Sequence, residues 1–291
     1  MTQLRYPINA LVSYFYFAKD DLSVLHQGGL RLIGDSGAYS ALTQGSKIDL
    51  KAFAEWGLKW SQNGTLCWVA ALDVIGDPRA TLKNYERLRG MGLDVIPTLH
   101  HGTKPADLDF YANDGVDFIG LGGLVGTNAN AGSMMRWCLS LMRYAQHTHP
   151  QVRFHGWGLT AIEPILNLPW WSVDSSSYGS AWRYGHMRLF NPRTAKFVSI
   201  RTDGKEAYHH HDLITRYYGV NPSQIAVVDH DSIPLHGRVS ARSYQYVEEA
   251  MKRKFPLASP TYGQFSATDR QGAHVVDGAK RHLKSLATEG N

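Results

Sequence analysis

The sequence predicts an α/β fold, a (β/α)8 barrel of the TIM type, with a small β-hairpin inserted in it. Short apolar runs alternate with amphipathic stretches along the 291 residues, which is the pattern of repeated strand–helix units. The apolar runs are continuous, as in strands that are buried on both faces of a parallel sheet. A doubly wound open sheet is the alternative. Because no linker, charge block or low-complexity segment interrupts the pattern, we expect residues 1–291 to form a single domain.

The apolar runs predict seven strands of this sheet. A short continuous apolar run is typical of a strand with both faces buried. In chain order the predicted strands are Leu32–Gly34, Cys67–Leu72, Asp94–Leu99, Asp117–Leu121, Val152–Gly156, Trp171–Val173 and Ile225–Val228.

Helical spacing and capping residues predict four helices between and after the strands. Asp49 precedes an apolar pattern that starts at Leu50 and stops at Asn63-Gly64. The pair Asp77-Pro78 places a capping residue before a proline at the first helical position, and Gly90 closes that helix. The other two helices are marked by apolar residues at helical spacing, one at Met135, Cys138, Leu139 and Met142 and a late one at Tyr244, Val247 and Met251.

One segment departs from the strand–helix rhythm. Met187–Phe190 and Lys196–Arg201 are two strand-like runs joined by the turn residues Asn191-Pro192, and Asp203-Gly204 follows them. This pattern predicts a β-hairpin insertion over about residues 186–204.

Composition limits the class of protein. Hydrophobic residues make up 43% of the chain and charged residues 19%, so the chain can bury a core. No run of 18 apolar residues is present, which argues against a membrane-spanning helix. The apolar stretch Leu11–Ala18 is followed by charged residues instead of a cleavage site, so we expect no signal peptide. Two cysteines, Cys67 and Cys138, are too few for a disulfide framework, which favours the cytoplasm. The net charge of +5 permits nucleic acid as a partner without requiring it.

Polar residues and glycines follow several of the predicted strands. Because the chemistry of a (β/α)8 barrel lies at the carboxyl ends of its strands, these residues are candidates for one site. Carboxylates accept hydrogen bonds from a purine edge or act as nucleophile and acid, and glycines allow a flat ligand to approach the backbone. The strand ends are Asp35-Ser36-Gly37, Asp73, His100-His101-Gly102, Gly122-Gly123-Leu124, Gly156-Trp157-Gly158, Asp174-Ser175-Ser176 and Asp229-His230-Asp231.

Each of these ends also has a simpler interpretation. A single aspartate after a strand is often only the N-cap of the next helix. Gly122-Gly123 alone fits a tight turn or a phosphate site, and His100-His101 fits a loop without a role. The combination of several polar strand ends favours a site.

Four of the segments resemble motifs of the tRNA-guanine transglycosylase superfamily. Gly34–Tyr39 resembles the T-D-S-G-G-[FY]-Q motif, and Gly122–Gly126 resembles the G-G-L-A-V-G motif. His155–Thr160 resembles the M-G-V-G-T segment. Val173-Asp174, followed by Arg183 and by Leu189-Phe190, resembles the stretch that carries the family's nucleophilic aspartate, basic residues and hairpin. The motifs occur in the family's order, between about Leu32 and Lys205.

The resemblance implies base exchange at a guanosine, without a cofactor. Asp174 would attack C1′, guanine would leave, and a covalent glycosyl-aspartyl intermediate would form. Asp35 would protonate the departing base and later accept the proton of an incoming 7-deazaguanine, which frees Asp174. Two displacements retain the configuration, as in retaining glycosidases.

The resemblance also implies the residues that bind the base. Asp73 would accept hydrogen bonds from N1–H and the exocyclic amine, the backbone of Gly123 and Leu124 would read the other edge, and Tyr39 would stack on the ring. The remaining expected substrate contacts are Ser36, His100, Gly122 and His155. His100 stands where the family has glutamine, and His155 stands where it has methionine.

The zinc subdomain of the tRNA enzymes has no counterpart here. Their C-x-C-x2-C motif requires cysteines, and none follows Cys138, so we expect no metal site. Tyr208-His209-His210-His211 stands where the family has the helix of that subdomain. Consecutive helical residues point about 100° apart and do not converge on one metal, so we expect these histidines on the surface.

A short chain without the zinc part resembles a second branch of the superfamily. This branch comprises the DpdA-type DNA transglycosylases of bacteriophages and bacterial DNA-modification clusters, which place 7-deazaguanines such as preQ0 in DNA. We therefore expect DNA as the partner, with tRNA as the alternative, and the host cytoplasm as the location if a phage encodes the chain. Duplex DNA hides C1′, so the enzyme would flip the nucleotide, act on single strands or use a partner protein that opens the duplex.

Four arginines around the hairpin are the expected phosphate contacts. They are Arg183, Arg188, Arg193 and Arg201. Trp182 and Tyr184 accompany Arg183, and an aromatic ring there is suited to stacking on an exposed base. Lys252-Arg253-Lys254 is expected to be a solvated helix end.

Two other classes of protein fit parts of the pattern. A non-catalytic nucleic-acid-binding barrel would be expected to lack Asp35 or Asp174, and both are present. A phosphate-binding isomerase or lyase would bind phosphate at Gly122-Gly123 and use a lysine as base. No lysine follows a predicted strand, which argues against this class.

Overall fold

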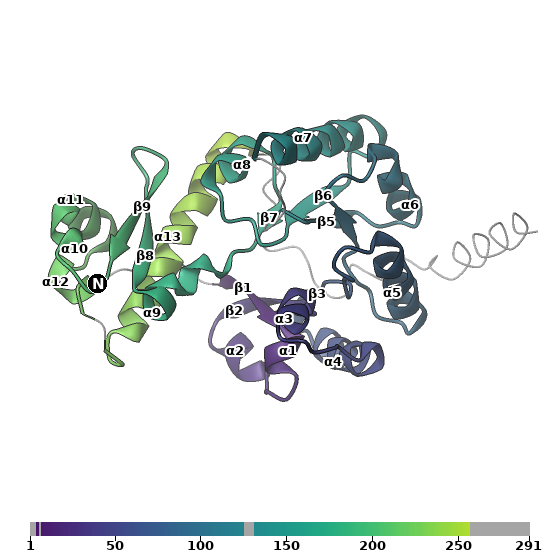
Figure 1. The fold of residues 1–291 in the computed structure, drawn as a ribbon, viewed down its shortest axis with the longest axis horizontal. Coiled ribbons are helices and arrows are strands. Elements are labelled where there is room, and N and C mark those ends of the chain that lie inside the picture. The colour runs from purple at the N-terminus through teal and green to yellow at the C-terminus, as the bar shows by residue number, and fades with distance from the viewer. Residues whose placement is uncertain (1–3, 6, 125–130, 228, 257–291) are drawn as a thin grey trace, which may run out of the picture. The chain divides into compact units, whose positions relative to one another are not determined.

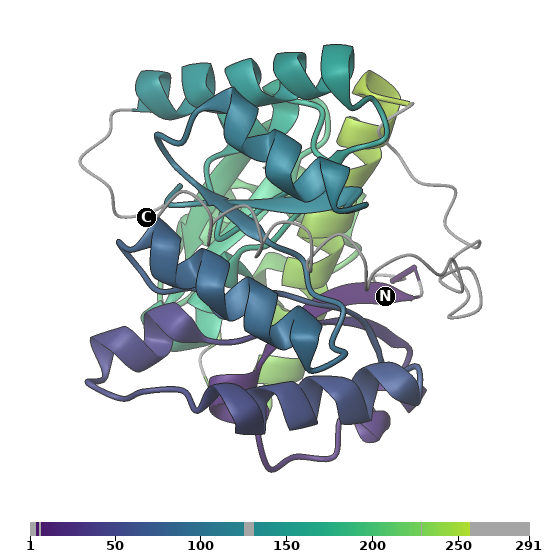
Figure 2. The ribbon, with the colours of Figure 1, turned by 90° about the vertical axis from the view of Figure 1, so that its right-hand side faces the viewer.

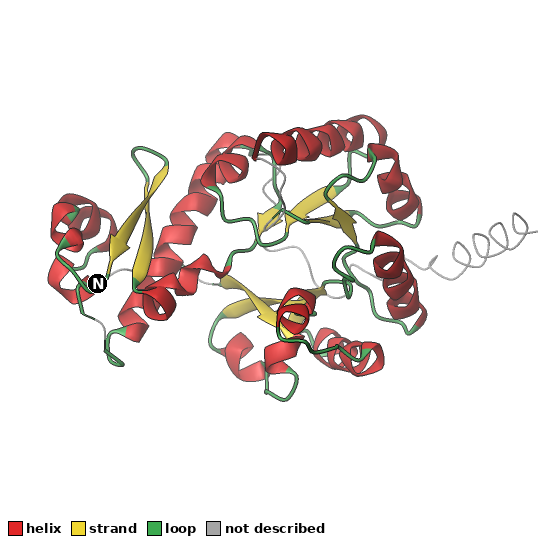
Figure 3. Ribbon diagram, viewed as in Figure 1, coloured by secondary structure: helices red, strands yellow, loops and turns green. Residues whose placement is uncertain are grey.

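The chain forms two compact units, each built from helices and strands (Figures 1 and 3). The computed structural model describes residues 4–5, 7–124, 131–227 and 229–256. The N-terminal unit runs from Asn9 to Trp157, and the C-terminal unit begins at Gly158 and includes the residues up to Ile8. The single domain over residues 1–291 stays a prediction.

Parallel strands form the centre of the N-terminal unit. β1 (Ile8–Ser13), β2 (Leu30–Asp35) and β3 (Leu66–Val69) are hydrogen-bonded in that order, and β2 and β3 run parallel. β4 (Thr98–His100), β5 (Phe118–Gly122) and β6 (Arg153–Gly156) are also parallel neighbours. The predicted parallel sheet is therefore confirmed. No closed sheet is found among the described strands, so the barrel stays a prediction.

A parallel bridge connects these two groups of strands. Ala70 pairs with Ile96, the N–H of Ile96 donates to the carbonyl of Val69 at 2.8 Å, and the N–H of Ala71 donates back to Ile96 at 2.8 Å. The carboxyl ends of β2 to β6 therefore belong to one hydrogen-bonded series. The predicted strand Asp94–Leu99 is reduced to this bridge and the start of β4.

Helices follow the strands of the N-terminal unit, as the alternating pattern predicts. Asp49 caps α4 (Leu50–Gln62) by accepting from the N–H of Ala52 at 2.7 Å. Asp77 caps α5 (Pro78–Gly90) through the N–H of Ala80 at 3.0 Å, with Pro78 at the first position. Figure 2 shows α4 and α5 side by side. The other helices of this unit are α1 (Tyr14–Phe17), α2 (Ser23–Gln27), α3 (Ala38–Thr43), the 3-10 helix η1 (Pro105–Asp107), α6 (Leu108–Asn113) and α7 (Ala131–Thr148).

The C-terminal unit is built around the hairpin and a long helix. β8 (His186–Asn191) and β9 (Lys196–Arg201) are antiparallel, with Asn191 opposite Lys196, so the predicted hairpin is confirmed. Its inward residues Met187, Leu189 and Ile200 are fully buried in one core with residues of α13 (Ile233–Lys254). The other elements are α8 (Ile162–Asn167), β7 (Ser172–Val173), the 3-10 helix η2 (Ser176–Gly179), α9 (Ser180–Tyr184), α10 (Glu206–His209), α11 (His211–Leu213), the π-helix η3 (Ile214–Tyr218) and α12 (Pro222–Ile225).

The predicted strand Ile225–Val228 is wrong over its described residues. Ile225 is the last residue of α12, and Ala226 and Val227 belong to no strand, while Val228 lies outside the described residues. Asn221 and Gln224 form a capping box that starts a helix at this point. Asp229 does not follow a strand either, and its carboxylate accepts from the N–H of Ser232 at 2.7 Å.

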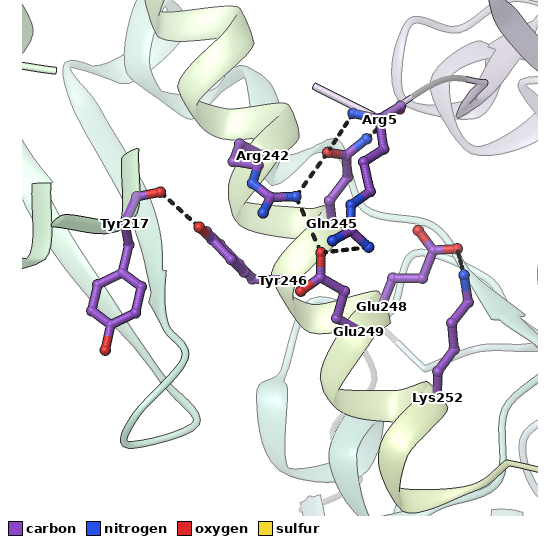
Figure 4. A network of polar contacts seen from close by, with 8 residues as sticks. All are labelled: Arg5, Tyr217, Arg242, Gln245, Tyr246, Glu248, Glu249 and Lys252. Carbon is purple, nitrogen blue, oxygen red and sulfur yellow. Dashed lines mark hydrogen bonds and ion pairs between the residues drawn. The ribbon is translucent and has the colours of Figure 1, made fainter. Parts of the chain in front are cut away.

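The first residues of the chain are held to the C-terminal unit by polar contacts with α13 (Figure 4). The N–H of Arg5 donates to Oε1 of Gln245 at 3.2 Å, and Nε2 of Gln245 donates to the carbonyl of Arg5 at 2.6 Å. The guanidinium groups of Arg5 and Arg242 both contact Glu249, at 3.3 and 3.1 Å. These contacts explain why the chain before β1 is part of the C-terminal unit. No described helix has the length and apolar character needed to cross a membrane.

Candidate functional site

Asp35 ends β2 in a loop that only glycine can complete. Its Oδ2 accepts the N–H of Gly37 at 2.9 Å. Gly37 has a φ of +77°, and a Cβ on it would lie 2.3 Å from Oγ of Ser13. A residue with a Cβ would therefore be strained at position 37, and the hydrogen bond from Gly37 holds the Asp35 carboxylate. Ser36 is buried beside it, whereas Tyr39 is 63% exposed at the start of α3.

Asp73 follows the next strand and is electrostatically coupled to Asp35. β2 and β3 are joined by the hydrogen bond from Ala70 N–H to Gly34, at 2.8 Å, so both aspartates follow neighbouring strands. Burial, with a smaller contribution from the negative charge of Asp35, raises the pKa of Asp73 to about 7. Its Oδ1 is buried and has no hydrogen-bond partner among the described residues. A ligand that brings a donor to this oxygen would satisfy it.

Thr98 of β4 affects the pKa of Asp73 and is hydrogen-bonded to Trp157, which follows β6. Thr98 lowers the pKa of the Asp73 carboxyl, against the larger effect of burial. The indole Nε1 of Trp157 in turn donates to Oγ1 of Thr98 at 3.1 Å. Thr98 was not among the predicted site residues, and Trp157 was predicted only as part of the strand end Gly156-Trp157-Gly158.

The two predicted histidines differ in their surroundings. Nε2 of His100 lies 3.3 Å from Oγ1 of Thr81, and burial lowers the pKa of His100, which favours the neutral ring. His155 is 1% exposed, and its ring centroid lies 4.0 Å from that of Trp157. His155 thus packs against the indole that donates to Thr98.

Gly122 of β5 leaves room for the side chains of Thr98 and Asp73. A Cβ on Gly122 would lie 2.7 Å from Cγ2 of Thr98 and 3.9 Å from Oδ2 of Asp73. Gly123 has a φ of +70°, so a side chain there would be strained. Leu124 is half-buried. Val125 and Gly126, the last residues of the predicted motif, lie outside the described residues.

Asp174 belongs to the C-terminal unit, where it follows β7. Its Oδ1 accepts the N–H of Gly158 at 2.7 Å, and Gly158 has a φ of +63°. Ser175 then caps η2 by accepting the N–H of Ser177 at 3.1 Å. Local hydrogen bonds therefore hold the carboxylate of Asp174 and the backbone that follows it.

Three of the four predicted phosphate-binding arginines make contacts within the C-terminal unit. Arg183 donates to the carbonyls of Ser176 and Gly179. Arg188 donates to the carbonyl of Thr160 at 3.3 Å and lies over the ring of Phe197. Arg201 pairs with Asp203.

Arg193 differs from these three. It is exposed in the turn between β8 and β9, and its guanidinium has no hydrogen bond to another described residue. The phosphate-binding role of all four arginines stays a prediction, and Arg193 has the side chain best suited to it.

The site residues thus fall into two sets. The N-terminal unit carries Asp35, Ser36, Tyr39, Asp73, His100, Gly122, Gly123, Leu124 and His155, and the C-terminal unit carries Asp174 and the arginines. Thr98 and Trp157 join the first set. A signal for them was present, because glycines inside a strand, here Gly120 and Gly122, often mark the close approach of another group.

The histidine segment belongs to the C-terminal unit. His209 and His211 are exposed on α10 and α11, and Nδ1 of His211 lies 3.3 Å from the carboxylate of Asp212. Within the described ranges, no group of three or more His, Cys, Asp and Glu side chains is arranged to hold a metal.

Comparison of the sequence with protein-family models and with curated proteins found no relative. No protein-family model matches the sequence, and no curated protein matches it. The likeness to the transglycosylases therefore rests on the four motifs alone.

Proposed function

We propose that the chain exchanges guanine in DNA for a 7-deazaguanine base through a covalent intermediate on Asp174. Asp174 attacks C1′, the bond from C1′ to the base breaks, and Asp35 gives the departing guanine its proton. The incoming base then attacks C1′, returns a proton to Asp35 and releases the Asp174 carboxylate. Transfer of tRNA guanine by the same steps is the alternative.

The observation that carries the proposal is the surroundings of Asp73. Its carboxyl has one unpartnered oxygen, lies near the Asp35 charge, and borders a strand that has glycine at position 122. Guanine and the 7-deazaguanines present N1–H and an exocyclic amine on one edge, and a carboxylate accepts from both. A pair of acidic groups with different environments also suits a site in which one binds and the other transfers a proton.

The environment of Asp174 is consistent with its assigned role. A nucleophile must be held in one orientation to attack C1′ in line. The hydrogen bond from Gly158 fixes Oδ1 of Asp174. The assignment of this residue as nucleophile follows the motif resemblance.

Nucleoside mass analysis of DNA tests the proposal in cells that make preQ0. With the wild-type chain we expect a deoxynucleoside of the 7-deazaguanine in DNA, and with Asp174→Ala we expect none. Asp212→Ala, which removes an exposed carboxylate of the same unit, is the matched control and should behave as wild type. Modified nucleoside in tRNA alone would favour the alternative, and modified DNA with Asp174→Ala would refute the assigned nucleophile.

A further inference from the structure

We infer that Thr81 and Asn84 of α5 are positioning residues that hold the backbone on both sides of Asp73 and so fix the direction of its carboxyl. The inference rests on the proposed role of Asp73 in binding the base. Neither residue was among those predicted for the site, and both act through the main chain next to Asp73.

The two side chains hold the two peptide groups that flank Asp73. Nδ2 of Asn84 donates to the carbonyl of Leu72 at 3.0 Å, and the N–H of Val74 donates to Oγ1 of Thr81 at 2.8 Å. Residues three apart lie on the same face of a helix, so one face of α5 makes both contacts. Because each peptide group is planar, holding both of them fixes the direction in which Cβ of Asp73 leaves the backbone.

The chain between Asp73 and α5 is held as well. The N–H of Asp77 donates to the carbonyl of Val74 at 2.9 Å, and the carboxylate of Asp77 accepts from the N–H of Ala80 at 3.0 Å. Thr81 is 1% exposed, so water cannot easily take the place of its hydroxyl as the partner of Val74. The position of this segment therefore depends on the hydroxyl of Thr81.

The same hydroxyl contacts His100, another residue expected to bind the base. Nε2 of His100 lies 3.3 Å from Oγ1 of Thr81. A hydroxyl has one proton and two lone pairs, and the N–H of Val74 occupies one lone pair. The proton and the second lone pair are left for His100 and for the carbonyl of Val74, which lies 3.4 Å away. Loss of this hydroxyl should therefore disturb two expected base contacts at once.

The first experiment follows the carboxyl 13C signal of Asp73 and the hydrogen exchange of the Val74 amide in the full chain at a fixed pH. Asp73→Asn identifies the carboxyl signal. Thr81→Val keeps the shape and removes the hydroxyl, so the Val74 amide should exchange about tenfold faster and the Asp73 signal should shift. Thr81→Ser should restore both. Asn84→Leu removes the other contact and should also shift the Asp73 signal, and it serves as the second variant if Thr81→Val does not fold.

The matched control is Tyr85→Phe, which removes a hydroxyl from the same helix. The hydroxyl of Tyr85 donates to the carboxylate of Asp114 at 3.0 Å, and this contact does not involve the chain next to Asp73. Tyr85→Phe should lower the free energy of unfolding in urea, as Thr81→Val does, and leave the Asp73 signal unchanged. A purely structural role of Thr81 would make the two variants alike.

Equilibrium dialysis of radiolabelled guanine gives the second readout. Thr81→Val should bind guanine about tenfold more weakly than the wild type, whereas Thr81→Ser and Tyr85→Phe should bind it as the wild type does. The inference would be overturned if Thr81→Val and Asn84→Leu both left the Asp73 signal unchanged, or if Thr81→Val bound guanine with wild-type affinity. If the Asp73 signal moves as expected while the wild type binds no guanine, the two hydrogen bonds position Asp73 and the proposed function fails.

Discussion

Asp73 shows how one residue can combine several opposing effects. Burial and the charge of Asp35 raise the pKa of its carboxyl, Thr98 lowers it, and the balance is a pKa of about 7. The sequence marked Asp73 by its place after an apolar run and by the resemblance to the transglycosylase motifs. Its environment could not be predicted, because Thr98 and Trp157 come from distant segments that the fold brings together.

Replacement of Asp73 should change how stability depends on pH. The carboxyl binds its proton more tightly in the folded state, with a pKa of about 7 against the ordinary 3.8. The free energy of unfolding of the wild type should therefore fall relative to Asp73→Asn between about pH 4 and pH 7, and then level off. The full difference corresponds to at most about 4 kcal/mol. Urea unfolding of both proteins from pH 4 to pH 9 measures it.

The control for this measurement is Asp212→Asn. This side chain is fully exposed, so its removal should leave the pH dependence of the wild type unchanged. If Asp73→Asn and the wild type kept a constant difference across the pH range, Asp73 would not be the group described here.

Among the elements, those with strong local signals were predicted correctly. The caps Asp49 and Asp77 and the turn of the hairpin act through hydrogen bonds to residues a few positions away, so the sequence contains the whole pattern. The strand at Ile225 was predicted wrongly, because a short apolar run does not distinguish a strand from a buried helical turn. The capping box at Asn221 was the missed signal.

Two arginines of the hairpin, for which the sequence predicts the same role, differ in their surroundings. Arg193 is exposed in the turn, whereas the charge of Arg201 is paired with Asp203. We expect Arg193→Gln to weaken binding of single-stranded DNA and to lower the slope of log affinity against log salt by about one. Arg201→Gln should have a smaller effect. Fluorescence anisotropy over a range of salt concentrations measures both, and equal effects of the two substitutions would contradict the difference in their surroundings.

At the scale of the whole molecule, the alternating pattern predicted the parallel strands β2 to β6, but it missed β1 and wrongly placed a strand at Ile225. It could not predict that contacts divide the chain near Trp157, because that division depends on long-range contacts such as those of Arg5 with α13. The N-terminal unit carries the residues proposed to bind the base, and the C-terminal unit carries the proposed nucleophile. The proposed reaction requires both.

The most direct test of the account is the covalent intermediate itself. Labelled single-stranded DNA containing guanosine is incubated with the protein and analysed on a denaturing gel, without an incoming base. We predict a slow band of protein-linked DNA with the wild type and none with Asp174→Asn, which should still bind the DNA on a native gel. A covalent band that persists with Asp174→Asn, or base exchange by a wild type that never forms one, would contradict the account.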